Sequence, residues 1–172
     1  MPGVADHRAI QDAAGPRAPL LLDESHRGEI ARHLLLLPEE QRYTRFFGAM
    51  SDEAIGSFVA RLDFADDLLV ALPGAQAGGF RGVVQASRHA PEAWELAFST
   101  APAYQRQGIA TLLGRWMIER LAAGGATQAY IFCAPKNIAM RGLARKLGFS
   151  VRVEDGEVTA QRTLEAGAAG GG

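Results

Sequence analysis

The sequence predicts one α/β domain (α+β in some classifications) in which helices flank a single mixed, mostly antiparallel sheet of six to seven strands. Three observations carry this prediction. Residues 24–62 repeat apolar side chains at helical spacing, residues 67–100 contain three strand patterns separated by turns, and residues 107–164 alternate strand and helix patterns. A chain of 172 residues can bury one full hydrophobic core, and we expect the domain to span residues 19–164.

The segment before Pro38 is expected to hold a short strand and a first helix. The stretch PLLLD, residues 19–23, has the length and composition of a short strand. Ser25 can cap the following helix by accepting a hydrogen bond from a backbone N–H group, and Pro38 stops that helix. Its apolar face consists of Ile30, Leu34 and Leu37. His26 and His33 are seven residues apart, too far for a helical metal pair, and are expected at the surface.

Residues 38–62 are expected to form two further helices. PEEQRYTRFFGAM (38–50) places aromatic residues at helical spacing, and Ser51 caps the next helix, SDEAIGSFVARL (51–62). The aromatic stripe of these helices consists of Tyr43, Phe46, Phe47 and Phe58. Such a stripe belongs to the core more often than to a binding surface, and any exposed part of it would line a binding cleft.

Three antiparallel strands are expected next. They are DLLVAL (67–72), FRGVVQAS (80–87) and AWELAFST (93–100), with PGAQAGG as the turn between the first two. Successive side chains of a strand point to opposite faces. In the third strand the large apolar side chains therefore share one face, and Glu95, Ala97 and Ser99 share the other.

The remaining residues predict a long helix, a strand, a helix and a closing hairpin. The long helix starts near Gln107 and ends at residues 122–125, and its inner stripe consists of Ile109, Leu112, Leu113, Trp116 and Leu121. The later elements are the buried strand QAYIFC (128–133), the helix NIAMRGLARKLGF (137–149) and two strands, 150–155 and 156–164, around a DG turn. Cys133, at the end of the buried strand, is expected to be a small core residue.

Composition and charge exclude several classes of function. The formal net charge of −1 and the lack of a Lys/Arg run argue against nucleic-acid and membrane-surface binding. The single cysteine excludes an intrachain disulfide and a cysteine-built zinc site, so we expect no metal and a reducing, cytoplasmic location. No apolar run approaches the roughly 20 residues of a membrane span. Residues 1–18 and 165–172 are expected to be flexible ends.

The stretch YQRQGIATLLGRWM, residues 104–117, places small residues at the start of the long helix. Gln105, Gly108 and Ala110 leave its first turn free of bulk, and the backbone N–H groups and helix dipole there favour an anion such as a diphosphate. The pattern has one glycine rather than three and no following Gly-Lys-Ser/Thr, so it is neither a dinucleotide fingerprint nor a Walker loop. Close packing of a neighbouring element is the alternative explanation for the small residues.

Two blocks of the sequence resemble a known family. ELAFSTAPAYQRQGIATLL followed by NIAMRGLARKLGF resembles the acetyl-CoA-binding half of GNAT-superfamily N-acetyltransferases. Gln105, Gly108 and Ala110 match the pyrophosphate loop of that family, and Asn137 and the Leu-Gly-Phe at 147–149 match its second block. The resemblance covers about residues 66–150. Residues 42–64 also resemble the region before the core in a bacterial subgroup that includes protein-lysine acetyltransferases.

The resemblance implies that acetyl-CoA lies between two central strands that splay apart. Backbone N–H groups at the end of strand 93–100 would polarise the thioester carbonyl, and residues 106–111 would hold the pyrophosphate. The Asn137 amide would bond the pantetheine arm, and Lys146 would approach the 3′-phosphate. The residues expected to bind the coenzyme are Phe98, Ser99, Thr100, Gln105, Arg106, Gln107, Gly108, Ile109, Ala110, Thr111, Asn137 and Lys146.

The catalytic residues match the family in part. Glu95 lies ten residues before Gln105, where related acetyltransferases place a glutamate, and is the candidate general base, acting through water. The alternative is a solvated strand residue. Many relatives carry a tyrosine seven residues after the Asn to protonate the leaving thiolate, but this chain has Ala144 there. Water, or Tyr104 as a weaker candidate acid, would have to take that role.

The resemblance implies an acetyl-CoA-dependent N-acetyltransferase that transfers an acetyl group to an amine by direct attack on the thioester. The acceptor is a protein amine or a small-molecule amine, and the resemblance of residues 42–64 favours a protein. A homodimer is left open. The alternative function is a sensor that binds CoA or acyl-CoA without turnover, which Ala144 makes conceivable.

Overall fold

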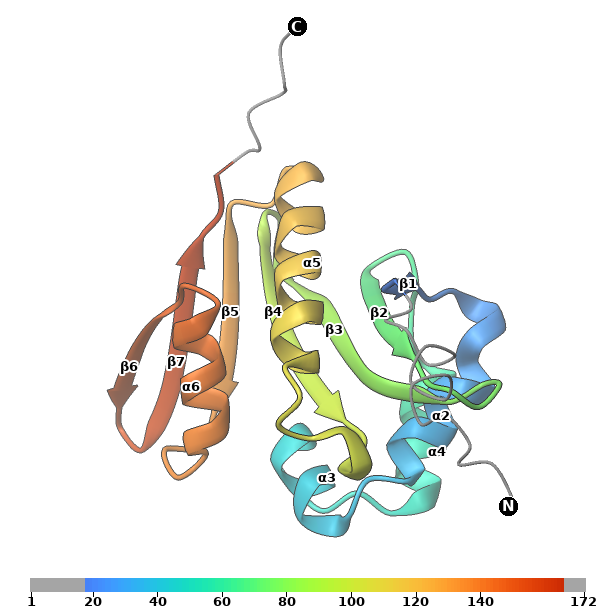
Figure 1. The fold of residues 1–172 in the computed structure, drawn as a ribbon. Coiled ribbons are helices and arrows are strands. Elements are labelled where there is room, and N and C mark those ends of the chain that lie inside the picture. Colours follow the sequence, from blue (N-terminus) through green and yellow to red (C-terminus); the bar gives the residue numbers. More distant parts are fainter. Residues whose placement is uncertain (1–17, 166–172) are drawn as a thin grey trace, which may run out of the picture.

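A computed structural model of the chain describes residues 18–165. At its centre lies one mixed sheet of seven strands in the order β1-β2-β3-β4-β5-β7-β6 (Figure 1). Neighbouring strands run antiparallel except β4 and β5, which run parallel. The strands are β1 (Leu20–Leu21), β2 (Asp67–Pro73), β3 (Phe80–Ala90), β4 (Ala93–Thr100), β5 (Gln128–Cys133), β6 (Ser150–Glu154) and β7 (Glu157–Thr163). The predicted sheet is confirmed, whereas the expected flexible ends fall almost wholly outside the described residues.

Helices cover both faces of the sheet. In Figure 1, α5 crosses β4 and α6 lies beside β5 and β7, while α2 and α4 lie at the β1–β3 end and α3 lies at the lower end of the sheet. The α-helices are α2 (Arg27–Leu35), α3 (Glu39–Phe46), α4 (Asp52–Ala60), α5 (Ile109–Ala123) and α6 (Ile138–Lys146). Two short 3-10 helices are η1 (Glu24–His26) and η2 (Pro102–Tyr104). Within residues 18–165, no helix is both long and apolar enough to cross a membrane.

The sheet separates two hydrophobic cores, because successive residues of a strand point to opposite faces. The core under α5 and α6 includes Val70, Val84, Leu96, Leu113 and Met117. The core under α2 and α4 includes Leu69, Val83, Ile30, Ile55 and Val59. On α5, Met117 and Ile118 are buried, whereas Leu112, predicted on the inner stripe, is 43% exposed. The helix approaches α6 closely at Gly114, where an added Cβ would lie 2.6 Å from a Leu147 methyl carbon.

The two parallel strands separate after a short stretch of pairing. β4 and β5 pair only over Ala93–Glu95 and Gln128–Tyr130. Beyond Glu95, β4 continues to Thr100 with β3 as its strand partner, and β5 continues to Cys133 with β7 as its partner. The facing edges of β4 and β5 therefore lack a strand neighbour from this point on. The predicted splayed pair is confirmed.

The first helix differs from its prediction at both ends. Asp23, rather than Ser25, provides the side-chain cap: it is the N-cap of η1, and its carboxylate accepts a hydrogen bond from the Ser25 backbone N–H group at 2.9 Å, whereas His26, the N-cap of α2, makes no side-chain cap bond. A carboxylate suits this position because its charge opposes the positive end of the helix dipole. The hydrogen bonds from the Ser25 hydroxyl and backbone lower the pKa of Asp23. A 3-10 turn then leads into α2, which ends at Leu35 rather than Leu37.

His33 is buried, with 3% of its surface exposed, so the prediction of a surface residue is wrong. The residue lies three positions after Ile30 on α2 and therefore shares the stripe that faces the sheet. Its Nε2 atom lies 2.9 Å from Ser99 Oγ on β4, which provides the polar partner that a buried imidazole requires.

Half of the predicted aromatic stripe lies at the surface. Phe46 and Phe58 pack in the second core with ring centroids 5.0 Å apart. Tyr43 and Phe47 are 55% and 56% exposed, so their assignment to the core is wrong. Phe47 is the C-cap of α3 and has a φ of 56°, a left-handed conformation that ends the helix there.

Candidate functional site

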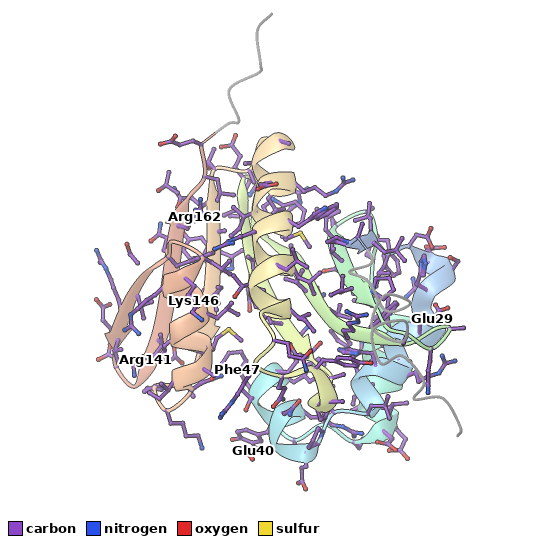
Figure 2. The ribbon with its side chains drawn as sticks, viewed as in Figure 1. Glu29, Glu40, Phe47, Arg141, Lys146 and Arg162 are labelled. Atoms are coloured by element: carbon purple, nitrogen blue, oxygen red, sulfur yellow. The ribbon has the colours of Figure 1, made fainter. Side chains whose placement is uncertain are left out.

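A cavity of about 510 Å³ lies where β4 and β5 diverge. Its walls are α3, the second half of β4, the loop that leads into α5, the end of β5 and the first half of α6. In Figure 2, Glu40 and Phe47 mark the α3 wall, and Arg141 and Lys146 mark α6. Of the residues expected to bind a coenzyme, those that line the cavity are Phe98, Ser99, Thr100, Gln105, Arg106, Ala110 and Asn137.

Gly108 is the N-cap of α5 and has a φ of 76°, in the left-handed region. No side chain caps this helix, which starts at Ile109 rather than near Gln107. An ideal Cβ on Gly108 would meet nothing within 4 Å, so conformation rather than crowding favours glycine here. Close packing therefore does not explain Gly108, and the backbone N–H groups of the first turn remain without a side-chain cap.

Several predicted coenzyme residues lie near the cavity without lining it. Gln107 is exposed, and its Nε2 atom donates to the Ala103 carbonyl oxygen at 3.2 Å. Ile109 is buried in the core, so only its backbone faces the loop. Lys146 is exposed in the last turn of α6, far along the helix from its N-cap Asn137. A role for these side chains in coenzyme binding stays a prediction.

Asn137 caps α6 with the same side chain that was expected to bind the coenzyme. Its Oδ1 atom accepts a hydrogen bond from the Met140 backbone N–H group at 3.0 Å. The carbonyl end of the amide is thus engaged by the helix, which leaves the Nδ2 group as the donor available to a ligand. The helix thereby fixes the direction in which that donor points.

The free edge of β4 presents main-chain groups to the cavity. The Ala101 N–H group donates to the Arg81 carbonyl oxygen on β3 at 2.9 Å. Hydrogen-bonded and non-hydrogen-bonded pairs alternate along antiparallel strands, so the N–H groups of Phe98 and Thr100 point away from β3, toward the cavity. These are two donors within the stretch 98–100 that the sequence singled out.

Glu95 and Ser99 lie on the face of β4 that is turned toward α2 and α3, and both line the cavity. Ser99 Oγ is the partner of His33 Nε2. Burial lowers the pKa of His33 to about 4, against smaller opposing effects of hydrogen bonds with the Phe80 and Ser99 backbone. The imidazole is therefore neutral at pH 7 and acts as a fixed hydrogen-bonding group rather than as a base.

A polar network that the sequence did not reveal lies beside Glu95. An Nη atom of Arg45 on α3 donates to Gln85 Oε1 at 2.6 Å, and Gln85 Nε2 donates to Asp67 Oδ1 at 3.2 Å. Ser87 Oγ donates to the same Asp67 oxygen at 2.8 Å. Burial lowers the pKa of Arg45 to about 10, against the opposing charges of Glu95 and Asp67, so the guanidinium stays protonated at pH 7. Gln85, a polar residue inside an apolar strand, is the signal that sequence reasoning missed.

The candidate acids lie in different places. The Tyr104 ring packs against the core, with the Arg81 guanidinium 5.7 Å from its centroid, and does not line the cavity. Ala144 is buried in the same core.

Cys133 is 7% exposed, as expected of a small core residue, and it also lines the cavity. Burial raises the pKa of its thiol.

Comparison with known proteins identifies similar families and folds. The model of the acetyltransferase (GNAT) family matches residues 26–149. Among solved structures, the GNAT domain of PAT from S. lividans is 21% identical, covers 85% of this chain and 89% of that chain, and has a TM-score of 0.72. RimL, a ribosomal L7/L12 alpha-N-protein acetyltransferase in complex with CoA, is 17% identical over 90% of this chain and 97% of that chain, with a TM-score of 0.69.

A third similar structure, yncA from Salmonella typhimurium with its cofactor acetyl-CoA, is 16% identical over 89% of this chain and 98% of that chain, with a TM-score of 0.67. No curated protein matches the chain significantly. The structural likenesses show the fold, and the family match spans most of the chain. The predicted class of N-acetyltransferase is thereby confirmed, and the chain belongs to the acetyltransferase (GNAT) family.

Proposed function

We propose that this protein binds acetyl-CoA in the cleft between β4 and β5 and transfers the acetyl group directly to an amine of a protein or small molecule. The observation that carries this proposal is the divergence of two parallel strands over a cavity that reaches the uncapped start of α5. RimL and yncA, which have the same fold, were solved with CoA and with acetyl-CoA.

The residues of the cleft fit the coenzyme part by part. The N–H groups of Phe98 and Thr100 face the cavity, and the Asn137 Nδ2 group is available to an amide of the pantetheine arm. The first turn of α5 offers backbone donors and the positive end of a helix dipole to the diphosphate, with the Arg106 side chain beside it. When bound, acetyl-CoA supplies a thioester whose carbonyl carbon an amine can attack.

Glu95 is the group that would accept the proton of the attacking amine. An alkyl ammonium has a pKa near 10.4 and must lose a proton before its nitrogen becomes a nucleophile. The Glu95 side chain lines the cavity on the face of β4 turned toward α3, and an ordered water would bridge it to the amine. The N–H groups of Phe98 and Thr100 would stabilise the negative charge that develops on the carbonyl oxygen.

Protonation of the leaving thiolate is assigned to water. Within the described residues, Asn137 is the one hydrogen-bonding side chain that α6 and its cap place in the cavity lining, alongside Ala139, Met140 and Leu143. A thiol of pKa about 8.5 leaves readily without a dedicated acid, so the alanine at 144 is compatible with turnover. Tyr104 stays a candidate that the geometry does not favour.

Two observations favour a polypeptide acceptor. The exposed rings of Tyr43 and Phe47 form an apolar rim on α3, and Phe47 also lines the cavity. RimL is by name an acetyltransferase of ribosomal L7/L12, and PAT provides another similar GNAT domain. Exposed apolar side chains that gather beside a cavity are typical of surfaces that contact another protein or a ligand.

The test measures coenzyme binding and turnover separately. We expect CoA to raise the melting temperature, and acetyl-CoA to release free thiol in the presence of a suitable amine. Glu95→Gln should lower kcat by about 10²–10⁴ with an unchanged CoA-induced shift, because it removes only the proton acceptor. Glu119→Gln, at an exposed position on α5, is the matched control.

Three outcomes would contradict parts of the proposal. If CoA does not raise the melting temperature, the coenzyme site is wrong. If CoA binds but no amine in a broad screen releases thiol, the protein is a sensor rather than an enzyme. If Glu95→Gln turns over like the Glu119→Gln control, the assignment of the base fails.

A further inference from the structure

One cation and one anion line the cavity where α3 meets β4. Glu95 lies on β4 and Arg45 on α3, and both line the cavity. Among the ion pairs of residues 18–165, none joins these two side chains. The two charges are close enough to interact, and each side chain can still bind a ligand.

Arg45 is held in place before any ligand arrives. One guanidinium nitrogen donates to Gln85 Oε1 at 2.6 Å, and the guanidinium carbon lies 4.7 Å from the centroid of the Phe46 ring. Gln85 is 5% exposed and is itself fixed by hydrogen bonds to Asp67 and Ser87. A guanidinium fixed in this way loses little side-chain entropy when it binds a ligand.

Among residues 18–165, the Arg45 side chain makes one hydrogen bond, to Gln85, and its remaining N–H donors have no acceptor there. The other two guanidinium nitrogens are accessible from the cavity or from solvent. They are not among the buried side-chain atoms of the described residues that lack a hydrogen-bond partner. A carboxylate or carbonyl oxygen is the ligand that such a planar fork of N–H groups binds best.

Arg45 lies on α3, beside the part of β4 that would face the reacting groups. Gln85, which holds the guanidinium, pairs with Ala97, and Ala97 lies between Glu95 and the N–H donors of Phe98 and Thr100. An amine that faces both Glu95 and the thioester would therefore carry its adjacent carbon past Arg45. A carboxylate or carbonyl group attached to that carbon would bring an oxygen within reach of the free donors.

We propose that the acceptor is an α-amino group whose α-carbon carries a carboxylate or carbonyl group, with Arg45 binding an oxygen of that group and Glu95 facing the amine. This inference rests on the proposed function and narrows its substrate. A free amino acid and the first residue of a polypeptide both present this arrangement. The side-chain amine of lysine and simple alkylamines do not, because no oxygen lies close to their nitrogen.

The experiment compares amines that carry a carboxylate or carbonyl group next to the amine-bearing carbon with amines that do not. The panel is alanine, alaninamide, an alanine tripeptide with a free N-terminus, isopropylamine and a lysine amide with a blocked α-amine. Wild type, Arg45→Lys, Arg45→Met and the exposed control Arg115→Met are assayed with acetyl-CoA. Each acceptor is compared with itself across the proteins, so differences in amine basicity cancel. The CoA-induced shift in melting temperature confirms that each variant is folded, and Arg45→Lys retains a donor for Gln85.

For the oxygen-bearing acceptors we expect Arg45→Met to lower kcat/KM about 10- to 100-fold, the loss that follows from removing a charge-assisted hydrogen bond. Most of the loss should lie in KM, and isopropylamine should change less than about twofold. Arg45→Lys should retain more activity toward these acceptors than Arg45→Met. A preference for alanine or alaninamide identifies a small-molecule acceptor, and a preference for the tripeptide identifies a polypeptide N-terminus.

Three results would overturn the inference. A wild-type preference for blocked lysine would show that the adjacent oxygen is not recognised. An equal loss for isopropylamine would place Arg45 at the thioester rather than at the acceptor. Failure of every α-amine in the panel, while CoA still binds, would also refute the substrate assignment. Failure to bind CoA would instead contradict the proposed function, so the two failures are distinguishable.

Discussion

Replacing Gly108 separates backbone strain from charge at the start of α5. The residue has a φ of 76° and a ψ of 9°, and an added Cβ would contact nothing within 4 Å. Gly108→Ala therefore introduces left-handed strain without a collision. Gly108→Asn carries a residue that tolerates this conformation, and Gly108→Glu adds a negative charge to the strain.

The expected magnitudes follow from that geometry. A left-handed residue other than glycine costs about 1–2 kcal/mol, which lowers the melting temperature of a domain of this size by about 2–8 °C. Gly108→Asn should lose less than Gly108→Ala. Two unit charges about 6 Å apart at an effective dielectric constant of about 20 repel by about 3 kcal/mol, so Gly108→Glu should bind CoA at least about tenfold more weakly than Gly108→Ala.

Calorimetric titration with CoA and thermal unfolding measure the two effects independently. Both variants carry the same backbone strain, so the comparison of Glu with Ala at position 108 isolates the effect of the longer, negatively charged side chain. Lowering the salt concentration should widen the difference between them. Equal CoA affinity of the folded Ala and Glu variants would show that no diphosphate lies at this helix end, and the site assignment would be refuted.

Two further predictions concern buried positions. The pKa of His33 is lowered from 6.5 to about 4, so its contribution to stability is present above pH 6.5 and is lost as the pH falls toward 4. Between pH 7 and pH 4, wild type should lose about 3 kcal/mol more unfolding free energy in urea than His33→Gln, and an equal loss would contradict the burial argument. Gly114→Ala should destabilise by about 1–3 kcal/mol because its Cβ would lie 2.6 Å from a Leu147 methyl carbon. Gly56→Ala on α4, where a Cβ meets nothing within 4 Å, should stabilise by about 0.5–1 kcal/mol, and similar effects at both glycines would contradict the packing argument.

The sequence predicted the sheet well because its strands carry strong local patterns. Alternation in AWELAFST placed Glu95 and Ser99 on one face of β4, and the structure keeps them there. The small residues at the start of α5 predict an anion site, with close packing as the alternative. An added Cβ at Gly108 would meet nothing within 4 Å, so the packing alternative is wrong for this residue, and the anion site stays a prediction. The left-handed conformation that favours glycine there cannot be inferred from residue type alone.

Features that depend on distant contacts were not predictable in the same way. His33 was placed at the surface by its residue type, although its spacing from Ile30 put it on the buried stripe of α2. Arg45 and Gln85 are 40 positions apart and meet only because α3 folds onto β3 and β4. Tyr43 and Phe47 have the spacing of a core stripe, yet both side chains are exposed near the end of α3. Local periodicity describes a helix but not which neighbour covers it.

The brief pairing of β4 with β5 makes the sheet behave as two panels joined by a narrow seam. One panel comprises β1 to β4, the other β5 to β7, and the seam comprises Ala93–Glu95 and Gln128–Tyr130. A longer seam would close the opening between the panels. Without any seam, side-chain packing alone would fix the distance between the panels. α5 braces the arrangement, because it contacts strands of the first panel and also α6, which packs on the second. The protein alone therefore sets the width of the opening between β4 and β5, before any ligand binds there.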